Sequence, residues 1–293
     1  MRADRKEIAI YEKGLPARMS LVEKVAAAKN LGFSAIEIAV DDDPGRIKRL
    51  DWDSQELASL KTALSEEDFS IQSITLSAHR VVPLGESDSN VSLEAKVIGH
   101  KAIKLARTLN IPIVQIAGYF SSPIDHSASS RGRFLEGLAD LTTQAEEAEI
   151  MLALENVDGS DVVSAEDGIS IVQEINSPAL RLYVDVGNFV ANGLDALHEL
   201  KTAMPYACAI QLKDTRPGTY RRVEFGAGGV PFRRLIEECI VDFATLPLSL
   251  ELWNDGDDTG PAERAINWFN SLWSDISSYR WDQLQSDDHG HSH

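Results

Sequence analysis

The chain has 293 residues, of which 43% are hydrophobic and 25% charged, and its formal net charge is −18 at pH 7. No apolar run approaches the roughly 18–20 residues of a membrane helix, so the composition indicates a globular protein that does not enter a membrane. The acidic balance argues against a nucleic-acid partner, because proteins that bind phosphate backbones recruit them with Lys and Arg. We therefore expect small-molecule partners.

The N-terminus shows no apolar signal core, which gives no reason to expect secretion. The two cysteines, Cys208 and Cys239, lie in apolar surroundings without the spacing of a metal finger or a redox motif. Such cysteines suit a reducing interior better than a disulfide framework. The sequence thus predicts a cytoplasmic protein.

β-rich runs alternate with amphipathic stretches along the whole chain. Strands are predicted at 7–13, 35–40, 71–77, 113–119, 150–156, 181–188, 208–214 and 248–253. Helices are predicted at 21–31, 54–66, 92–109, 131–147, 165–175, 194–201, 232–239 and 261–273. Eight strands, each followed by a helix, are typical of a (β/α)8 TIM barrel. A doubly wound open sheet is the alternative, but no GxGxxG loop follows the first strand.

No linker, low-complexity block or composition shift divides the chain. We expect one barrel domain over residues 1–275. The remaining residues, 276–293, form a polar C-terminal tail that we expect to be flexible.

Four oxygen-bearing side chains close the predicted strands five to eight. They are Glu155 in "LALEN", Asp185 in "LYVDVGN", Gln211 in "IQLKDT" and Glu251 in "LSLELW". In a barrel of this kind these strand ends converge on one mouth, where active sites lie. A carboxylate-rich set suits a divalent cation such as Mg, Mn or Zn. From the spacing alone, acids that merely cap the following helices are an equally good explanation.

A run of motifs resembles a known family. "IAIYEKGLP", "LDW", "LSAHR", "IKLARTLNI", "QIAGY", "VDVGN", "LKDT", "FGAGG" and "LELW" occur in the order found in the L-ribulose-5-phosphate (L-xylulose-5-phosphate) 3-epimerases, a hexulose-6-phosphate isomerase-like group within the xylose-isomerase-like TIM barrel superfamily. The resemblance extends from about Glu7 to about Trp273. It implies a metal-dependent 3-epimerase whose substrate is a ketopentose 5-phosphate.

The resemblance also implies a metal-ligand set. In that family a Glu, an Asp, a His and a Glu close strands five to eight, and Glu155, Asp185 and Glu251 match three of them. The family's "HLKDT" reads "QLKDT" here, so Gln211 takes the fourth ligand position. Because an amide oxygen is a weaker donor than imidazole, we expect Mn or Mg to be favoured, with Zn still possible. The alternative is that Gln211 only hydrogen-bonds substrate or water.

The implied reaction inverts carbon 3 through an enediolate. Glu155 and Glu251 would act as acid and base on opposite faces of the sugar, while Asp185 would be a ligand only. Cationic and polar side chains and glycine amides would bind the substrate and its phosphate. The candidates are His79 and Arg80 in "LSAHR", Asn188, Arg222, Lys13 and the backbone of 226–229. For His79 a purely structural role in the core is nearly as well supported.

Other functions stay open at this level. One is another sugar or sugar-phosphate isomerase, or a dehydratase, of the same superfamily. A second is a degenerate barrel that binds sugar phosphate without turnover, with Gln211 as the mark of lost activity. A nuclease with a multi-zinc site is disfavoured by the scarcity of histidines at the strand ends. Many barrels of this class are dimers, so a homodimer is possible.

Overall fold

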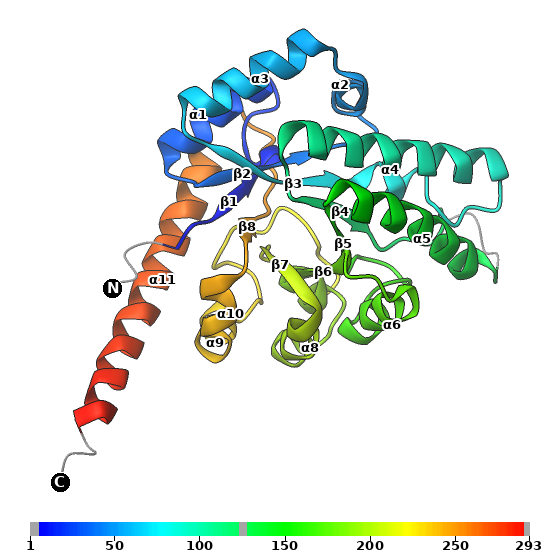
Figure 1. The fold of residues 1–293 in the computed structure, drawn as a ribbon. Coiled ribbons are helices and arrows are strands. Elements are labelled where there is room, and N and C mark those ends of the chain that lie inside the picture. The colour runs from blue at the N-terminus through cyan, green and yellow to red at the C-terminus, as the bar shows by residue number, and fades with distance from the viewer. Residues whose placement is uncertain (1–5, 123–127, 290–293) are drawn as a thin grey trace.

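The computed structural model describes residues 6–122 and 128–289, with side chains through residue 278. In this part of the chain eight parallel strands close into a barrel, in which each strand pairs with its sequence neighbours and β8 pairs with β1. The helices surround the barrel on the outside (Figure 1). The predicted (β/α)8 fold is confirmed.

The strands are short and almost entirely buried, because a barrel strand faces side chains inside and helices outside. They are β1 Ala9–Tyr11, β2 Ala35–Ala39, β3 Ser70–Leu76, β4 Ile113–Ala117, β5 Met151–Glu155, β6 Leu180–Asp185, β7 Ala207–Leu212 and β8 Leu248–Leu250. Every predicted strand overlaps one of them, although β3, β6 and β7 begin one residue before the prediction. This agreement reflects the continuous apolar runs that a sheet buried on both faces requires.

The helices cover the outer face of the barrel. They are α1 Leu21–Leu31, α2 Pro44–Ile47, α3 Ser54–Glu66, α4 Ser89–Leu109, α5 Ser130–Ala148, α6 Ala165–Ile175, α7 Val186–Ala191, α8 Ala196–Ala203, α9 Phe232–Glu238, α10 Ile240–Thr245 and α11 Gly260–His289, with 3-10 helices η1 Glu12–Gly14, η2 Lys48–Asp51, η3 Ser77–Arg80 and η4 Met204–Tyr206. Local capping sets several starts. At α1, for example, Ser20 and Glu23 form a reciprocal capping box.

Strand six ends earlier than the sequence indicated. The prediction continued it to Asn188, but β6 stops at Asp185 and α7 begins at Val186. The Asp185 side chain caps this helix by accepting hydrogen bonds from the amides of Gly187 (2.8 Å) and Asn188 (3.1 Å). A short buried apolar run has the same composition in a strand as in a helix, so the cap decides which one forms.

The last helix is longer than predicted. The sequence placed its end at Trp273 and the end of the domain at 275, but α11 continues through these positions to His289 and projects away from the barrel (Figure 1). Neither proline nor glycine occurs in 274–289 to stop it. Of the tail 276–293 that was expected to be flexible, residues 290–293 lie outside the described residues.

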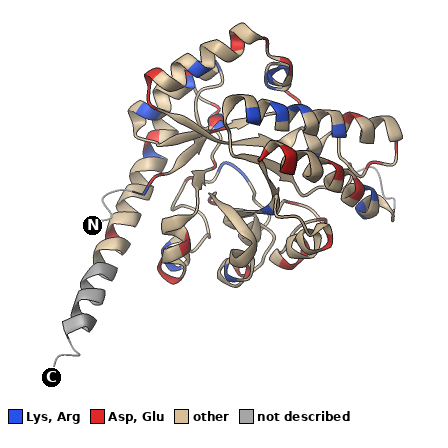
Figure 2. Cartoon of the chain, in the orientation of Figure 1, with Lys and Arg blue, Asp and Glu red and all other residues tan. Residues whose placement is uncertain are grey.

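The apolar core fills the space between the barrel and its helices. Charged residues of both signs lie mainly on the outward helix faces and in the loops (Figure 2). None of the helices in the described ranges is both long and apolar enough to span a membrane.

The inside of the barrel also contains a polar layer, which consists of Glu37, Ser73, Gln115, Tyr183, Gln211 and Ser249, all 0% exposed. Such a layer is unusual because barrel interiors are mostly filled with branched apolar side chains. Its members hydrogen-bond one another, although the amide oxygen of Gln115 has no partner in the described part of the chain.

Candidate active site

Three carboxylates from distant parts of the sequence meet at the C-terminal mouth of the barrel. Glu155 ends β5, Asp185 ends β6, and Glu251 directly follows β8. One oxygen of each lies within 4.8 Å of one oxygen of the others. They are 8%, 0% and 7% exposed, so little water is available to screen their mutual repulsion. The predicted convergence of these acids is what the barrel geometry produces.

Asp185 is held from two sides. Its Oδ1 caps α7, and its backbone amide and carbonyl both bond the side chain of Asn156, at 2.8 and 2.9 Å. Asn188 in turn donates to the Asn156 carbonyl at 2.7 Å. Gly187 completes the turn, since a Cβ there would lie 2.3 Å from the Lys213 carbonyl oxygen. Oδ2 of Asp185 is thereby directed away from the helix and towards the other carboxylates.

Lys213 lies among these acids, and the sequence analysis did not single it out. Its Nζ is 2.7 Å from Asp185 Oδ2 and 2.8 Å from Glu251 Oε2. The ammonium is ion paired with both oxygens, and no other group in the described part of the chain donates a hydrogen bond to either of them. The sequence did contain a signal for this lysine. Lys213 directly follows β7, just as Glu251 directly follows β8.

Burial and mutual repulsion dominate the electrostatics of the site. Burial, followed by the charges of Glu251 and Asp185, raises the pKa of Glu155 well above its ordinary value. Burial likewise raises the pKa of Asp185, and the neighbouring Lys213 partly offsets the rise. The carboxylates in turn raise the pKa of Lys213 despite its burial, so the lysine stays charged. The raised pKa values mean that ionising all three acids together is unfavourable unless a cation lies close to them.

Glu155 and Glu251 border a cavity of about 340 Å³ at the barrel mouth, while Asp185 is fully buried behind them. Trp253 forms one wall, and its ring lies 5.6 Å from Lys213 Nζ and 5.3 Å from the guanidinium carbon of Arg221. Asp158 forms another, where it accepts hydrogen bonds from Tyr119 and Arg80. This mouth cavity thus combines acids at its floor with aromatic and cationic groups around its rim.

The residues predicted to bind substrate divide into two groups. Arg80, Asn188 and Lys13 line the mouth cavity. His79 does not: it is 1% exposed, and its Nε2 lies 2.9 Å from the Ala95 carbonyl. Burial lowers the pKa of His79 to about 4, so the ring is neutral. The structure thus gives this histidine the core position that the sequence analysis held as the alternative.

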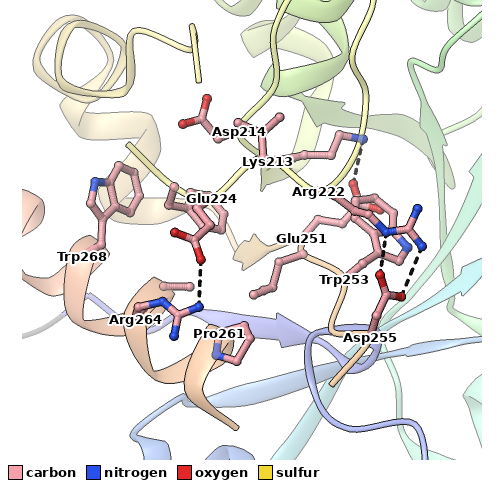
Figure 3. A pocket seen from close by; sticks show the side chains of 14 residues that line it. Lys213, Asp214, Arg222, Glu224, Glu251, Trp253, Asp255, Pro261, Arg264 and Trp268 are labelled. Atoms are coloured by element: carbon pink, nitrogen blue, oxygen red, sulfur yellow. Dashed lines mark hydrogen bonds and ion pairs between the residues drawn. The ribbon is translucent and has the colours of Figure 1, made fainter. Parts of the chain in front are cut away.

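Arg222 lines a neighbouring cavity of about 390 Å³ between the loop after β7 and the start of α11. Its guanidinium is ion paired with Asp255 at 2.6 Å, and both side chains are exposed. The two cavities share a wall, which contains Glu251, Lys213 and Trp253. Figure 3 shows these three residues among those that line the second cavity. The adjacent Arg221, which the sequence analysis passed over, is the arginine of this loop that reaches the mouth cavity.

The glycine-rich stretch 226–229 already has an anionic partner inside the protein. Asp214 Oδ2 accepts hydrogen bonds from the amides of Gly226 (2.8 Å) and Gly228 (2.9 Å). A Cβ at Gly228 would lie 2.0 Å from the Asp214 carboxylate, which explains the need for glycine. These amides stabilise the loop around a buried carboxylate and are not directed at the mouth cavity.

Gln211 belongs to the polar layer beneath the carboxylates. Its amide oxygen accepts from Gln115 at 3.2 Å, and its amide nitrogen donates to Glu37 at 3.2 Å. It pairs with Asp185 across the β6–β7 ladder, which places it beside the acidic site. Its role as a fourth metal ligand stays a prediction.

The acidic site fits a divalent cation. Three carboxylates converge at one point. Two of their oxygens, Asp185 Oδ2 and Glu251 Oε2, are buried and accept no hydrogen bond in the described residues apart from their ion pairs with Lys213. An all-oxygen donor set of this kind suits hard cations such as Mg²⁺ or Mn²⁺.

Comparison with known proteins gives a consistent picture. A family model described as xylose isomerase-like TIM barrel matches residues 25–272. The chain is 34% identical over 263 residues to L-ribulose-5-phosphate 3-epimerase UlaE of Salmonella typhi, and the alignment covers 89% of this chain and 93% of the relative. The enzyme of that name from Escherichia coli (strain SMS-3-5 / SECEC) matches to the same extent.

Solved structures share the fold at lower sequence identity. An L-ribulose 3-epimerase superposes with a TM-score of 0.77 at 16% identity, covering 95% of this chain and 98% of the other. A D-allulose 3-epimerase from Methylomonas sp., in complex with D-allulose, gives a TM-score of 0.74 at 18% identity, covering 92% and 98%. At these identities the likeness concerns the fold.

Proposed function

The chain belongs to the xylose isomerase-like TIM barrel family, in the branch of the L-ribulose-5-phosphate 3-epimerases, and from this premise we propose that it is a metal-dependent 3-epimerase of a ketopentose 5-phosphate. Membership makes it an enzyme of the isomerase class that acts on a small sugar. The convergence of Glu155, Asp185 and Glu251 at the barrel mouth, where both glutamates line one cavity, is the observation that carries the finer proposal.

The proposed reaction moves one proton at carbon 3. That carbon lies next to the ketone, so its proton is acidic, and a carboxylate on one face removes it while an acid on the other face returns one. Glu155 on β5 and Glu251 after β8 would take these two roles. The raised pKa of Glu155, caused first by burial, suits a carboxyl group that can hold a proton and return it to the substrate.

Asp185 would contribute a ligand and no proton transfer, because its Oδ1 is occupied by the cap of α7. Glu155, Asp185 and Glu251 would together hold a divalent cation, with Mn or Mg favoured over Zn. When bound, the cation supplies positive charge that stabilises the enediolate oxygens. Gln211 as the fourth ligand would use the amide oxygen that Gln115 now contacts.

The phosphate of the substrate would meet the cationic rim of the mouth cavity. Arg221 lies over Trp253, and Arg80 lies over Tyr119 with its guanidinium carbon 5.3 Å from the ring centroid. Lys13, the third rim cation, is ion paired with Asp41. Arg222 remains a candidate as well, although to reach this cavity it would have to release Asp255. Charge-assisted hydrogen bonds from such groups are the usual means of binding phosphate.

The test is exchange of the carbon 3 proton with solvent deuterium, followed by NMR. We expect exchange and epimerisation of L-ribulose 5-phosphate and L-xylulose 5-phosphate, loss of both after chelation, and recovery with Mn²⁺. Unphosphorylated L-ribulose should react more slowly. Binding of the phosphorylated sugars without exchange would instead support the non-catalytic barrel, and migration of the carbonyl would support an aldose–ketose isomerase.

A further inference from the structure

Lys213 contacts the very oxygens that a divalent cation would use. Its Nζ lies 2.7 Å from Asp185 Oδ2 and 2.8 Å from Glu251 Oε2. Both oxygens are buried, and no other group in the described residues donates a hydrogen bond to them. The residue is only 5% exposed. A buried ammonium and a divalent cation that draw on the same oxygens repel each other strongly, since little solvent lies between them.

The position of Lys213 is fixed by its main chain, while its side chain has an alternative partner. The Lys213 carbonyl is packed against Gly187 at the start of α7, which holds the main chain close to this helix. The ring of Trp253 lies 5.6 Å from Nζ and faces the same two cavities that Lys213 lines. An aromatic face can hold an ammonium that has left its carboxylates. Figure 3 shows the lysine reaching across between these groups.

We propose that Lys213 is the resident counter-ion of this site: it neutralises Asp185 and Glu251 while no divalent cation is bound, and it competes with the cation for Asp185 Oδ2 and Glu251 Oε2. The inference rests on the metal site of the proposed function. Three buried carboxylates without a counter-ion would destabilise the metal-free fold, because uncompensated buried charge is costly. The lysine therefore keeps the metal-free protein folded and makes the cation easier to exchange.

The experiment compares Lys213→Met with the parent and with Lys13→Met. Methionine keeps an unbranched side chain and removes the charge. Lys13 lines the same cavity but pairs with Asp41, outside the acidic site, so it controls for a general loss of positive charge at the mouth. Protein is stripped with chelator and dialysed, its affinity for Mn²⁺ is measured by titration calorimetry, and its melting temperature is measured in chelator and in saturating Mn²⁺.

We expect Lys213→Met to bind Mn²⁺ about tenfold more tightly than the parent or better, since a unit charge in direct contact with the ligands is removed. Its melting temperature should fall in chelator and recover to near the parent's in Mn²⁺. Lys13→Met should show a much smaller change in affinity. If Lys213→Met refolds only with Mn²⁺, the proposal is also supported.

Four results would overturn the proposal. The first is Mn²⁺ affinity in Lys213→Met that is equal to or below the parent's. The second is a melting deficit of the same size with and without Mn²⁺. The third is failure to fold even with Mn²⁺, which would give the lysine a structural role that a cation cannot replace. The fourth is no Mn²⁺ binding by parent or variant. Carbon 3 exchange is not used here, so the epimerase assignment is judged separately.

Discussion

Glu155 and Glu251 lie together at the barrel mouth, and the proposed reaction gives them opposite tasks. Both are nearly buried, both border the mouth cavity, and each offers one oxygen to the acidic site. At the scale of single residues, the question is which side chains move the proton, which bind the cation and which only support the site.

Replacing either glutamate by its amide should abolish epimerisation while the fold is kept. Glu155→Gln and Glu251→Gln each lose a proton-transfer group, which contributes typically about 10²–10⁴-fold in rate, and a charged ligand as well. The measurement is deuterium exchange at carbon 3, with circular dichroism to confirm folding. Asp42→Asn is the control, because Asp42 lines the same cavity without belonging to the acidic site. Near-parent turnover in either glutamine variant would remove that residue from the acid/base pair.

Gln211→His should raise the affinity for Zn²⁺. Imidazole is a better donor for this ion than an amide oxygen, and the change restores the ligand set that the resemblance in the sequence implies. Competition with a chromogenic chelator measures Zn²⁺ and Mn²⁺ affinity in parent and variant. Unchanged Zn²⁺ affinity, together with loss of metal in Glu155→Ala, would show that Gln211 only links Gln115 to Glu37 within the polar layer.

Glu37 should make the metal-free protein less stable as the pH rises. Burial raises its pKa from 4.5 to about 7. The folded state therefore holds a proton that the unfolded chain releases, so this contribution is full below pH 4.5 and is lost as the pH rises through about 7. A difference of this size corresponds to roughly 3 kcal/mol at most.

Urea unfolding in chelator between pH 5 and 8 measures this effect. Glu37→Gln should show a flatter profile than the parent, because its side chain cannot ionise. The Gln oxygen can still accept from Ser249, which contacts Glu37 Oε2 at 3.2 Å, while its NH2 group can donate to the hydroxyl oxygen of Ser73, which contacts Oε1 at 2.8 Å. Parallel profiles for the two proteins would mean that Glu37 does not titrate in this range.

At the scale of elements, the loop between β7 and α9 decides which cations face the substrate. Asp214 anchors it through the amides of Gly226 and Gly228, and Arg216 and Thr219 form a bridge within it. The two successive arginines of this loop diverge: Arg221 lies over Trp253 and lines the mouth cavity, while Arg222, at a φ of 60°, is ion paired with Asp255.

These two arginines form a matched pair for a test of phosphate binding. Arg221→Ala should lower kcat/KM for the phosphorylated ketose by roughly tenfold to a hundredfold, as expected for the loss of one charge-assisted hydrogen bond. It should change the rate on the unphosphorylated sugar little. Arg222→Ala should affect both substrates weakly. A larger loss of kcat/KM on the phosphorylated ketose in Arg222→Ala than in Arg221→Ala would show that Arg222 binds the phosphate. Equal losses on both sugars in Arg221→Ala would mean that Arg221 only supports the loop.

At the scale of the whole molecule, barrel closure turns separate strand ends into one site. A cation held by Glu155, Asp185 and Glu251 links β5, β6 and the end of β8, so its binding is coupled to the integrity of the barrel. A homodimer also stays a prediction, which analytical ultracentrifugation can test.

Mn²⁺ should raise the melting temperature of the chelator-stripped protein. At a hundredfold excess over its Kd a ligand that binds only the folded state adds about 2.7 kcal/mol, which corresponds to roughly 4 °C for a chain of this length. Scanning calorimetry with and without Mn²⁺ measures the shift. Asp185→Asn should reduce it, and an unchanged melting temperature in the parent would argue against a cation that bridges these strands.

The sequence alone determined the barrel and the three acids. Continuous apolar runs such as β5 and β6 predict buried parallel strands, and the acids that close them were identified by their equivalent positions, since the strand ends of a barrel converge.

Only the tertiary structure decided the roles of residues whose local pattern is ambiguous. Lys213 and Gln211 lie two positions apart, yet one contacts the acids and the other the polar layer, because their partners come from other strands. A short motif also could not predict which side chains face the mouth cavity, as three residues show: His79, Arg221 and Arg222. Burial in the core and the path of the loop decide this, and both depend on the tertiary structure.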